Sequence, residues 1–181
     1  KELEGNGPDS ARRFAEDALA GLAAVLVALT IVAIVAMPWL MYLLAPGFSA
    51  APEKFDLAVL MTQITFPYLL CMSLVALFSG VLNTFGKFVE SSAVSIVLNV
   101  TLLSGIFVSY WLGHLDSPEG GIVQAIAVFV AGVLQLWLLV DGLRRNNFSL
   151  RLRRPRMKEG MRRLIRIGIP GVIAGGVTQI N

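Results

Sequence analysis

Residues 57–82 read LAVLMTQITFPYLLCMSLVALFSGVL and contain no charged side chain. A helix of about 20 apolar residues crosses the roughly 30 Å hydrocarbon core of a bilayer, so this stretch is long enough to span a membrane. Residues 19–44, 93–112 and 122–143 have a similar length and apolar character. The pattern predicts an all-α fold, a polytopic transmembrane helical bundle.

Composition indicates the same class of protein. Hydrophobic residues make up 56% of the chain and charged residues 15%, whereas a soluble domain carries about a quarter of charged residues. The net charge of +3 fits contact with anionic lipid headgroups at one membrane face, and no nucleic-acid partner is expected. The single cysteine, Cys71, lies in an apolar stretch and has no second cysteine to pair with, so neither a disulfide framework nor a metal cluster is expected. The sequence predicts no cofactor.

The basic residues are distributed unevenly among the gaps between the apolar stretches. Three precede the first stretch, Lys87 stands between the second and third, and ten fall within residues 144–166, whereas the other two gaps hold only Lys54. Short cytoplasmic loops are enriched in Lys and Arg. The asymmetry predicts that residues 1–17 and 144–166 are cytoplasmic, in a multi-pass membrane protein.

Four segments follow from these patterns. Residues 1–17 form a cytoplasmic segment, residues 18–143 a four-helix transmembrane unit, and residues 144–166 a basic linker. Apolar residues recur at helical spacing after Pro155, which predicts an interfacial helix within the linker. Residues 167–181 begin a fifth apolar span that stops short of the required length, so we expect an internal fragment of a longer protein.

The second apolar stretch carries a distinct face. Small and polar residues follow one another at steps of three or four, which places them on one side of a helix. They are Thr62, Thr65, Leu69, Ser73, Ala76, Gly80, Asn83 and Lys87. Such a face is poorly suited to lipid, and two alternatives remain: a tight helix contact or the lining of a water-filled cavity. Pro67 cannot donate a backbone hydrogen bond to Gln63, which predicts a kink that could serve as a conformational bending point.

Polar residues also share faces in the third and fourth stretches. Ser91, Ser95 and Asn99 recur in the third, and Gln124 and Gln135 lie on one face of the fourth. Amides in hydrocarbon need partners, so these faces serve either structural hydrogen bonds or a polar lumen. The candidates for a substrate path are Thr62, Thr65, Asn83, Lys87, Asn99 and Gln135. Arg162, Arg163 and Arg166 could hold lipid headgroups, although membrane topology alone also explains them.

Catalysis is not expected. His114 and Asp116 are the one conceivable catalytic pair, and their external loop supplies no nucleophile or metal-ligand companion. No charged residue lies deep within a complete apolar stretch, although ion-coupled pumps usually need one. These residues therefore disfavour an integral membrane enzyme.

Three motifs in order carry a family resemblance. They are Ala45-Pro-Gly-Phe48, the segment ITFPYL at residues 64–69, and GVLNTFGKF at residues 80–88. With these motifs the chain resembles the MurJ/MviN family of bacterial lipid II flippases. Leu98-Asn99, Gly132-Val-Leu-Gln135 and the basic linker before Gly168-Ile-Pro170 are similar too.

The resemblance implies a two-lobe exporter fold of the multidrug/oligosaccharidyl-lipid/polysaccharide superfamily. The chain would form part of the N-terminal lobe, holding its helices three to six and the start of seven. It implies flipping of lipid-linked peptidoglycan precursor by alternating access, with membrane lipids, that precursor and the remaining helices of the protein as partners. The family's cavity arginines have no counterpart in this chain. A related drug or polysaccharide-lipid exporter and a non-transporting membrane scaffold are the alternatives.

The charge asymmetry makes a testable prediction of topology. In a full-length protein freed of Cys71, a cysteine at Lys87 should be protected from a membrane-impermeant thiol reagent added outside the cell, and a cysteine at Ser117 should react. External labelling at Lys87 together with protection at Ser117 would reverse the predicted orientation.

Overall fold

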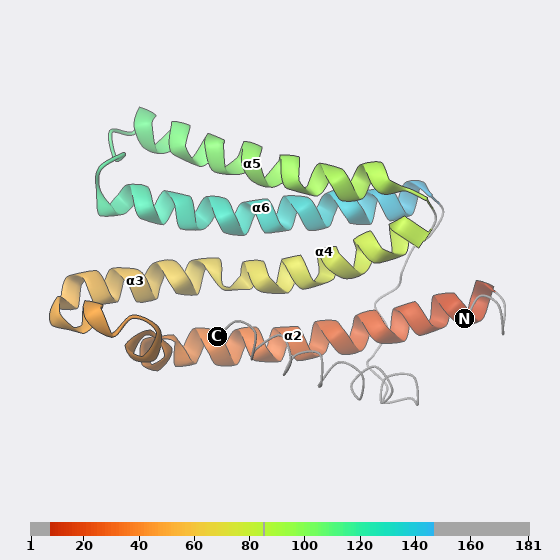
Figure 1. Cartoon of the computed structure of the whole chain (residues 1–181), viewed down its shortest axis with the longest axis horizontal. Helices are drawn as coiled ribbons and strands as arrows, with labels where there is room; N and C mark the ends of the chain where they lie inside the picture. The colour runs from red at the N-terminus through yellow and green to blue at the C-terminus, as the bar shows by residue number, and fades with distance from the viewer. Residues whose placement is uncertain (1–7, 85, 147–181) are drawn as a thin grey trace. The chain divides into compact units, whose positions relative to one another are not determined.

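The computed structural model describes residues 8–84 and 86–146, and every long element within them is a helix (Figure 1). In chain order these are α2 (Pro8–Leu44), the short 3₁₀ helix η1 (Pro46–Ala50), α3 (Pro52–Thr65), α4 (Pro67–Thr84), α5 (Phe88–Trp111) and α6 (Pro118–Arg145). The predicted interfacial helix, the fifth span and the three linker arginines lie outside the described residues. Leu26–Ser149 is one compact unit, and the packing described below belongs to it. The other unit contributes only the first part of α2, up to Val25, to the described residues.

Among the described residues, four helical segments are long and apolar enough to cross a membrane. They are Leu19–Leu44, Pro52–Thr84, Phe88–Trp111 and Pro118–Arg145, the second of which comprises α3 and α4. This confirms the prediction of an all-helical chain with four long apolar helices. The second segment starts at Pro52, before the apolar stretch at 57–82, because proline and an acidic residue such as Glu53 both suit the first turn of a helix.

Tight turns join α4, α5 and α6 into a consecutive antiparallel set (Figure 1). Gly86 and Gly113 have φ angles of 70° and 73° in the two connections. Residues with a Cβ atom rarely adopt this left-handed conformation, so glycine allows the chain to reverse within a few residues. In the packed unit α6 lies between α4 and α5 (Figure 1).

Helix α6 is the centre of the packed unit, since it contacts α3, α4 and α5. Its buried face consists largely of small residues, which let helix backbones approach closely. The buried residues are Gly120, Ala125, Ala127, Ala131, Gly132, Gln135, Leu139, Gly142 and Leu143. A Cβ atom placed on Gly132 would lie 2.7 Å from Cδ2 of Tyr68 and 3.0 Å from Cβ of Cys71. Glycine at position 132 thus sets the distance between α6 and α4.

A second cluster joins the end of α2 to α3. Met37, Met41, Phe55 and Val59 are buried together, and the rings of Tyr42 and Phe55 have centroids 4.4 Å apart. Van der Waals packing of these side chains holds the contact where the two helices meet the connection containing η1.

The surfaces away from these contacts are strongly apolar. On α5, for example, Ile96, Val100, Leu103 and Phe107 are each more than half exposed. A contiguous apolar surface of this kind marks an interaction with a membrane or a protein. Here the length of the helices makes the bilayer its natural environment.

Replacing Gly132 with leucine should destabilise the full-length protein by about 1–3 kcal/mol, because the new side chain overpacks the α4–α6 contact. The control is Gly80→Leu, since a Cβ built at Gly80 meets no atom of another helix within 4 Å. Thermal unfolding in detergent would measure both variants. An equal loss of stability in the two would contradict this assignment of the packed face.

Candidate functional site

Helix α4 has two opposite faces. Its packed face contains Cys71, Leu74, Val75, Phe78 and Leu82, all buried. At 100° per residue, the small and polar face predicted from the sequence lies on the other side of the helix. We call that side the α4 face, and it comprises Leu69, Ser73, Ala76, Gly80 and Asn83, with Lys87 continuing it beyond the helix end.

The α4 face is open in the described structure. Leu69, Ala76, Gly80, Asn83 and Lys87 are exposed and Ser73 is partly exposed. The close helix contact that was one alternative for this face is therefore not made by the described residues. The face remains available to water, a ligand or other helices.

The hydroxyl groups on this side bond to their own helices. Thr62 Oγ1 donates to the carbonyl of Ala58 at 2.7 Å, and Thr65 Oγ1 lies 3.0 Å from the carbonyl of Met61. Ser73 Oγ donates to Leu69 O at 2.8 Å. Such bonds satisfy the hydroxyl hydrogen without a second helix. Thr62 and Thr65, both partly buried, thus present polar atoms without requiring an interhelical partner.

A side-chain hydrogen bond connects the α4 face to α5. Ser91 Oγ lies 3.0 Å from Asn83 Oδ1 and donates to it. Ser95 and Asn99 follow Ser91 at four-residue steps and are exposed, and Asn99 Nδ2 donates to Ser95 O at 3.0 Å. The structure thus joins the polar residues of α4 and α5 at one point, and Lys87 stands on the turn between them.

Gln135 occupies a different environment from the other predicted path residues. Its side chain is fully buried, and Nε2 donates to the carbonyl of Val94 on α5 at 2.9 Å. Among the described residues its Oε1 atom has no partner. Of the two alternatives for the α6 face, the structure uses this amide for helix packing, and it does not bring Gln135 together with Asn83 or Lys87.

Two further polar atoms are buried at the α5–α6 contact. Ser109 Oγ and Gln124 Oε1 are without a hydrogen-bond partner in the described part of the chain. A Cβ on Gly105 would lie 2.8 Å from Gln124 Oε1, which shows how closely this amide approaches α5. The sequence analysis did not identify Ser109 as a buried polar residue. The available signal was its four-residue spacing from Gly105.

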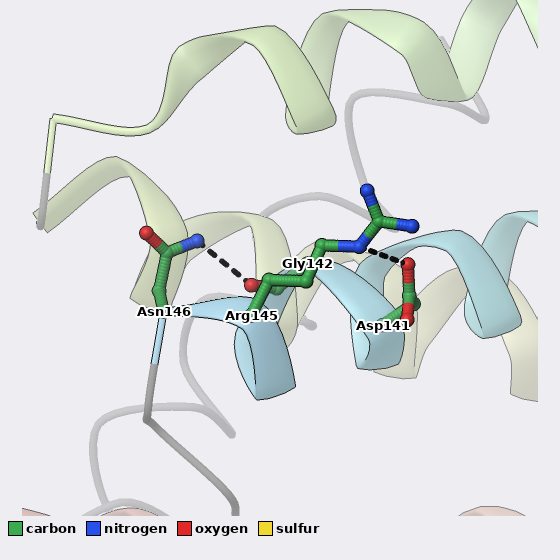
Figure 2. A network of polar contacts seen from close by, with 4 residues as sticks. All are labelled: Asp141, Gly142, Arg145 and Asn146. Atoms are coloured by element: carbon green, nitrogen blue, oxygen red, sulfur yellow. Dashed lines mark hydrogen bonds and ion pairs between the residues drawn. The ribbon is translucent and has the colours of Figure 1, made fainter.

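The charged end of α6 is shown in Figure 2. Arg145 Nε lies 2.7 Å from Asp141 Oδ2, and Asn146 Nδ2 donates to Gly142 O at 2.8 Å. The Arg145 side chain is 78% exposed, so the ion pair contributes little stability. A Cβ on Gly142 would lie 3.6 Å from Cβ of Glu90, which places the start of α5 at the same end of the packed unit. We call this end, with Lys87, Arg144 and Arg145, the basic end.

Long apolar helices, a small-residue core and charges at the helix ends define a multi-pass membrane protein. The family model described as "Lipid II flippase MurJ" matches residues 1–181. The chain belongs to the MurJ lipid II flippase family, whose members are multi-pass proteins of the bacterial inner membrane.

Individual relatives agree with this assignment. The chain is 42% identical to the probable lipid II flippase MurJ of Rhizobium tropici and 36% identical to that of Rhizobium meliloti (strain 1021), with the whole chain aligned in both cases. It is 32% identical over 97% of its length to the lipid II flippase MurJ of Burkholderia cenocepacia. The chain covers 34% of the length of each of these relatives. It thus corresponds to about a third of a full-length family member.

Proposed function

We propose that the whole protein, of which this chain represents about a third, moves lipid II across the bacterial inner membrane by alternating access. The family match over the entire chain supports this function. The observation that carries it is the α4 face, an open small and polar surface in a unit whose other exposed side chains are largely apolar. The protein is on this view a transporter and not an enzyme.

The chemistry of the substrate fits such a surface. A lipid-linked precursor has a polar headgroup, which must avoid hydrocarbon, and an apolar tail, which can stay in it. Along α4, the α4 face supplies a hydroxyl group, an amide group and the exposed backbone of a glycine. Neutral polar groups cost far less free energy in the membrane than charged groups do. We assign Thr62, Thr65, Asn83, Lys87 and Asn99 to the lining of the headgroup path, and leave Gln135 to helix packing.

The placement of the chain in the whole protein is part of the proposal. We place the described helices in the N-terminal lobe of a two-lobe exporter fold, with its central cavity on the side of the α4 face. The basic end faces the cytoplasm by the enrichment of Lys and Arg in cytoplasmic loops. Lys87, exposed at that end, then stands where an anionic headgroup would first meet the path.

Enlarging the α4 face should obstruct transport without unfolding the protein. Ala76→Leu and Gly80→Leu add bulk where the described chain is open, so we expect a several-fold loss of lipid II translocation at unchanged thermal stability. Val100→Leu is the matched control, because Val100 is 56% exposed on the apolar side of α5. If all three full-length variants translocate equally well, the α4 face does not line the path. If Gly80→Leu loses stability instead, the face packs against another helix.

Loss of the full-length protein should block delivery of the precursor. On depletion in the native bacterium, lipid II should accumulate in the inner leaflet, measured by its accessibility to an externally added enzyme that modifies its headgroup. Residues 1–181 alone should not restore exposure, since they cover only a third of the relatives' length. Normal exposure after depletion, in cells without a redundant flippase, would refute the proposed function.

A further inference from the structure

The second membrane segment loses a backbone hydrogen bond at its middle. Helix α3 ends at Thr65 and α4 begins at Pro67, and Phe66 between them keeps helical angles (φ −57°, ψ −38°). Proline has no N–H group, so the carbonyl of Gln63 loses its helical donor, while Phe66 N still donates to Thr62 O at 2.8 Å. Pro38 lies inside α2 without interrupting it. The break at Pro67 is thus a property of that position and not of every proline in these helices.

The half before the break is attached to α2. Gln63 Nε2 donates to the carbonyl of Ile34 at 2.9 Å. Phe55 and Val59 pack with Met37 and Met41 in the buried cluster. Helix α3 and the adjoining part of α2 therefore share both an interhelical hydrogen bond and an apolar core. We call this pair the outer pair, comprising residues 34–42 and 52–65.

The half after the break is attached to α5 and α6. Tyr68 and Cys71, directly beyond Pro67, close onto Gly132 of α6. Asn83 at the other end of α4 accepts the hydrogen bond from Ser91 of α5. We call α4, α5 and α6 the triad, and small residues hold its members at close distance.

The contact between the outer pair and the triad is of a different kind. Helix α3 does touch α6, and there the terminal methyl of Met61 lies 3.0 Å from a Cβ built on Gly121. The Met61 side chain is flexible, and Gly121 opposite it has no side chain. The surfaces of α3 and α6 can therefore slide at this point without breaking a hydrogen bond. Side-chain hydrogen bonds thus join α3 to α2 and α5 to α4, whereas α3 and α6 pack without one between the described residues.

We propose that Pro67 is a hinge about which the outer pair tilts against the triad, an inference that rests on the proposed alternating-access function. The 14 residues of α3 form an arm of roughly 21 Å, so a change of about 20° in the kink would move its far end by about 7 Å. A displacement of this size opens or closes the end of the bundle opposite the basic end. The α4 face belongs to the triad, and the adjoining part of α2 belongs to the outer pair. The hinge therefore changes the position of α2 relative to the α4 face.

Distance measurements between spin labels test the hinge without any transport assay. In the full-length, Cys71-free protein in lipid nanodiscs, labels at Glu53 and Trp111 report the outer pair against the triad, and labels at Leu69 and Phe107 report within the triad. We expect a broad or two-peaked distribution for the first pair and a narrow one for the second. Pro67→Ala, which restores the missing donor, should narrow only the first. Equally narrow distributions in the unmodified protein, or no effect of Pro67→Ala, would overturn the proposal.

Cross-linking tests the same motion by its effect on lipid II translocation. A short bifunctional thiol reagent would join Met61→Cys to Gly121→Cys across the hinge, or Glu90→Cys to Gly142→Cys within the triad as a control. We expect the first cross-link to lower translocation several-fold, reversibly on reduction, and the second to leave it within about twofold. Unchanged translocation with the first cross-link formed would overturn the hinge. If no full-length protein translocates lipid II, the proposed function fails, and the spin-label distances alone decide whether Pro67 bends.

Discussion

The close approach of α6 to its neighbours is the contact on which the packed unit depends. Without a hydrophobic driving force between helices in lipid, association relies on van der Waals contact, and small residues bring the helix surfaces together. Gly132 against Tyr68 and Cys71, and Gly105 against Ala127, are the places where a side chain has no room. These glycines lower the intrinsic helix propensity of α5 and α6, and the packing that they permit compensates for it.

That contact also determines the exposed side of α4. Because its larger apolar residues, among them Leu74, Phe78 and Leu82, are buried on the packed side, the opposite side presents Ala76, Gly80 and Asn83. A helix that uses bulky residues for packing and leaves small and polar ones exposed reverses the arrangement expected at a lipid surface. This reversal is the physical basis for placing the headgroup path on the α4 face.

Neutral polar groups are distributed so that most do not depend on a distant partner. Thr62, Thr65 and Ser73 bond to carbonyls of their own helices, whereas Gln135 bonds across to Val94. Interhelical hydrogen bonds in membranes contribute on average about 0.6 kcal/mol each, so this one sets the register of α5 and α6 more than it stabilises them. Charged groups such as Asp141 and Arg145 remain near the helix end.

The amino-acid sequence by itself determined the four membrane-length helices and the family, because length, hydropathy and motif order are properties of the linear chain. It could not distinguish the polar face of α4 from that of α6. Both have polar residues that share one side of the helix, yet the structure exposes Asn83 and buries Gln135 completely. The sequence did single out Pro67, where α3 passes to α4, whereas only the structure shows that α2 continues through Pro38. Only the tertiary structure decided these points, because the side of a helix that packs depends on the shape of its neighbours, and sequence spacing records only which residues share a side.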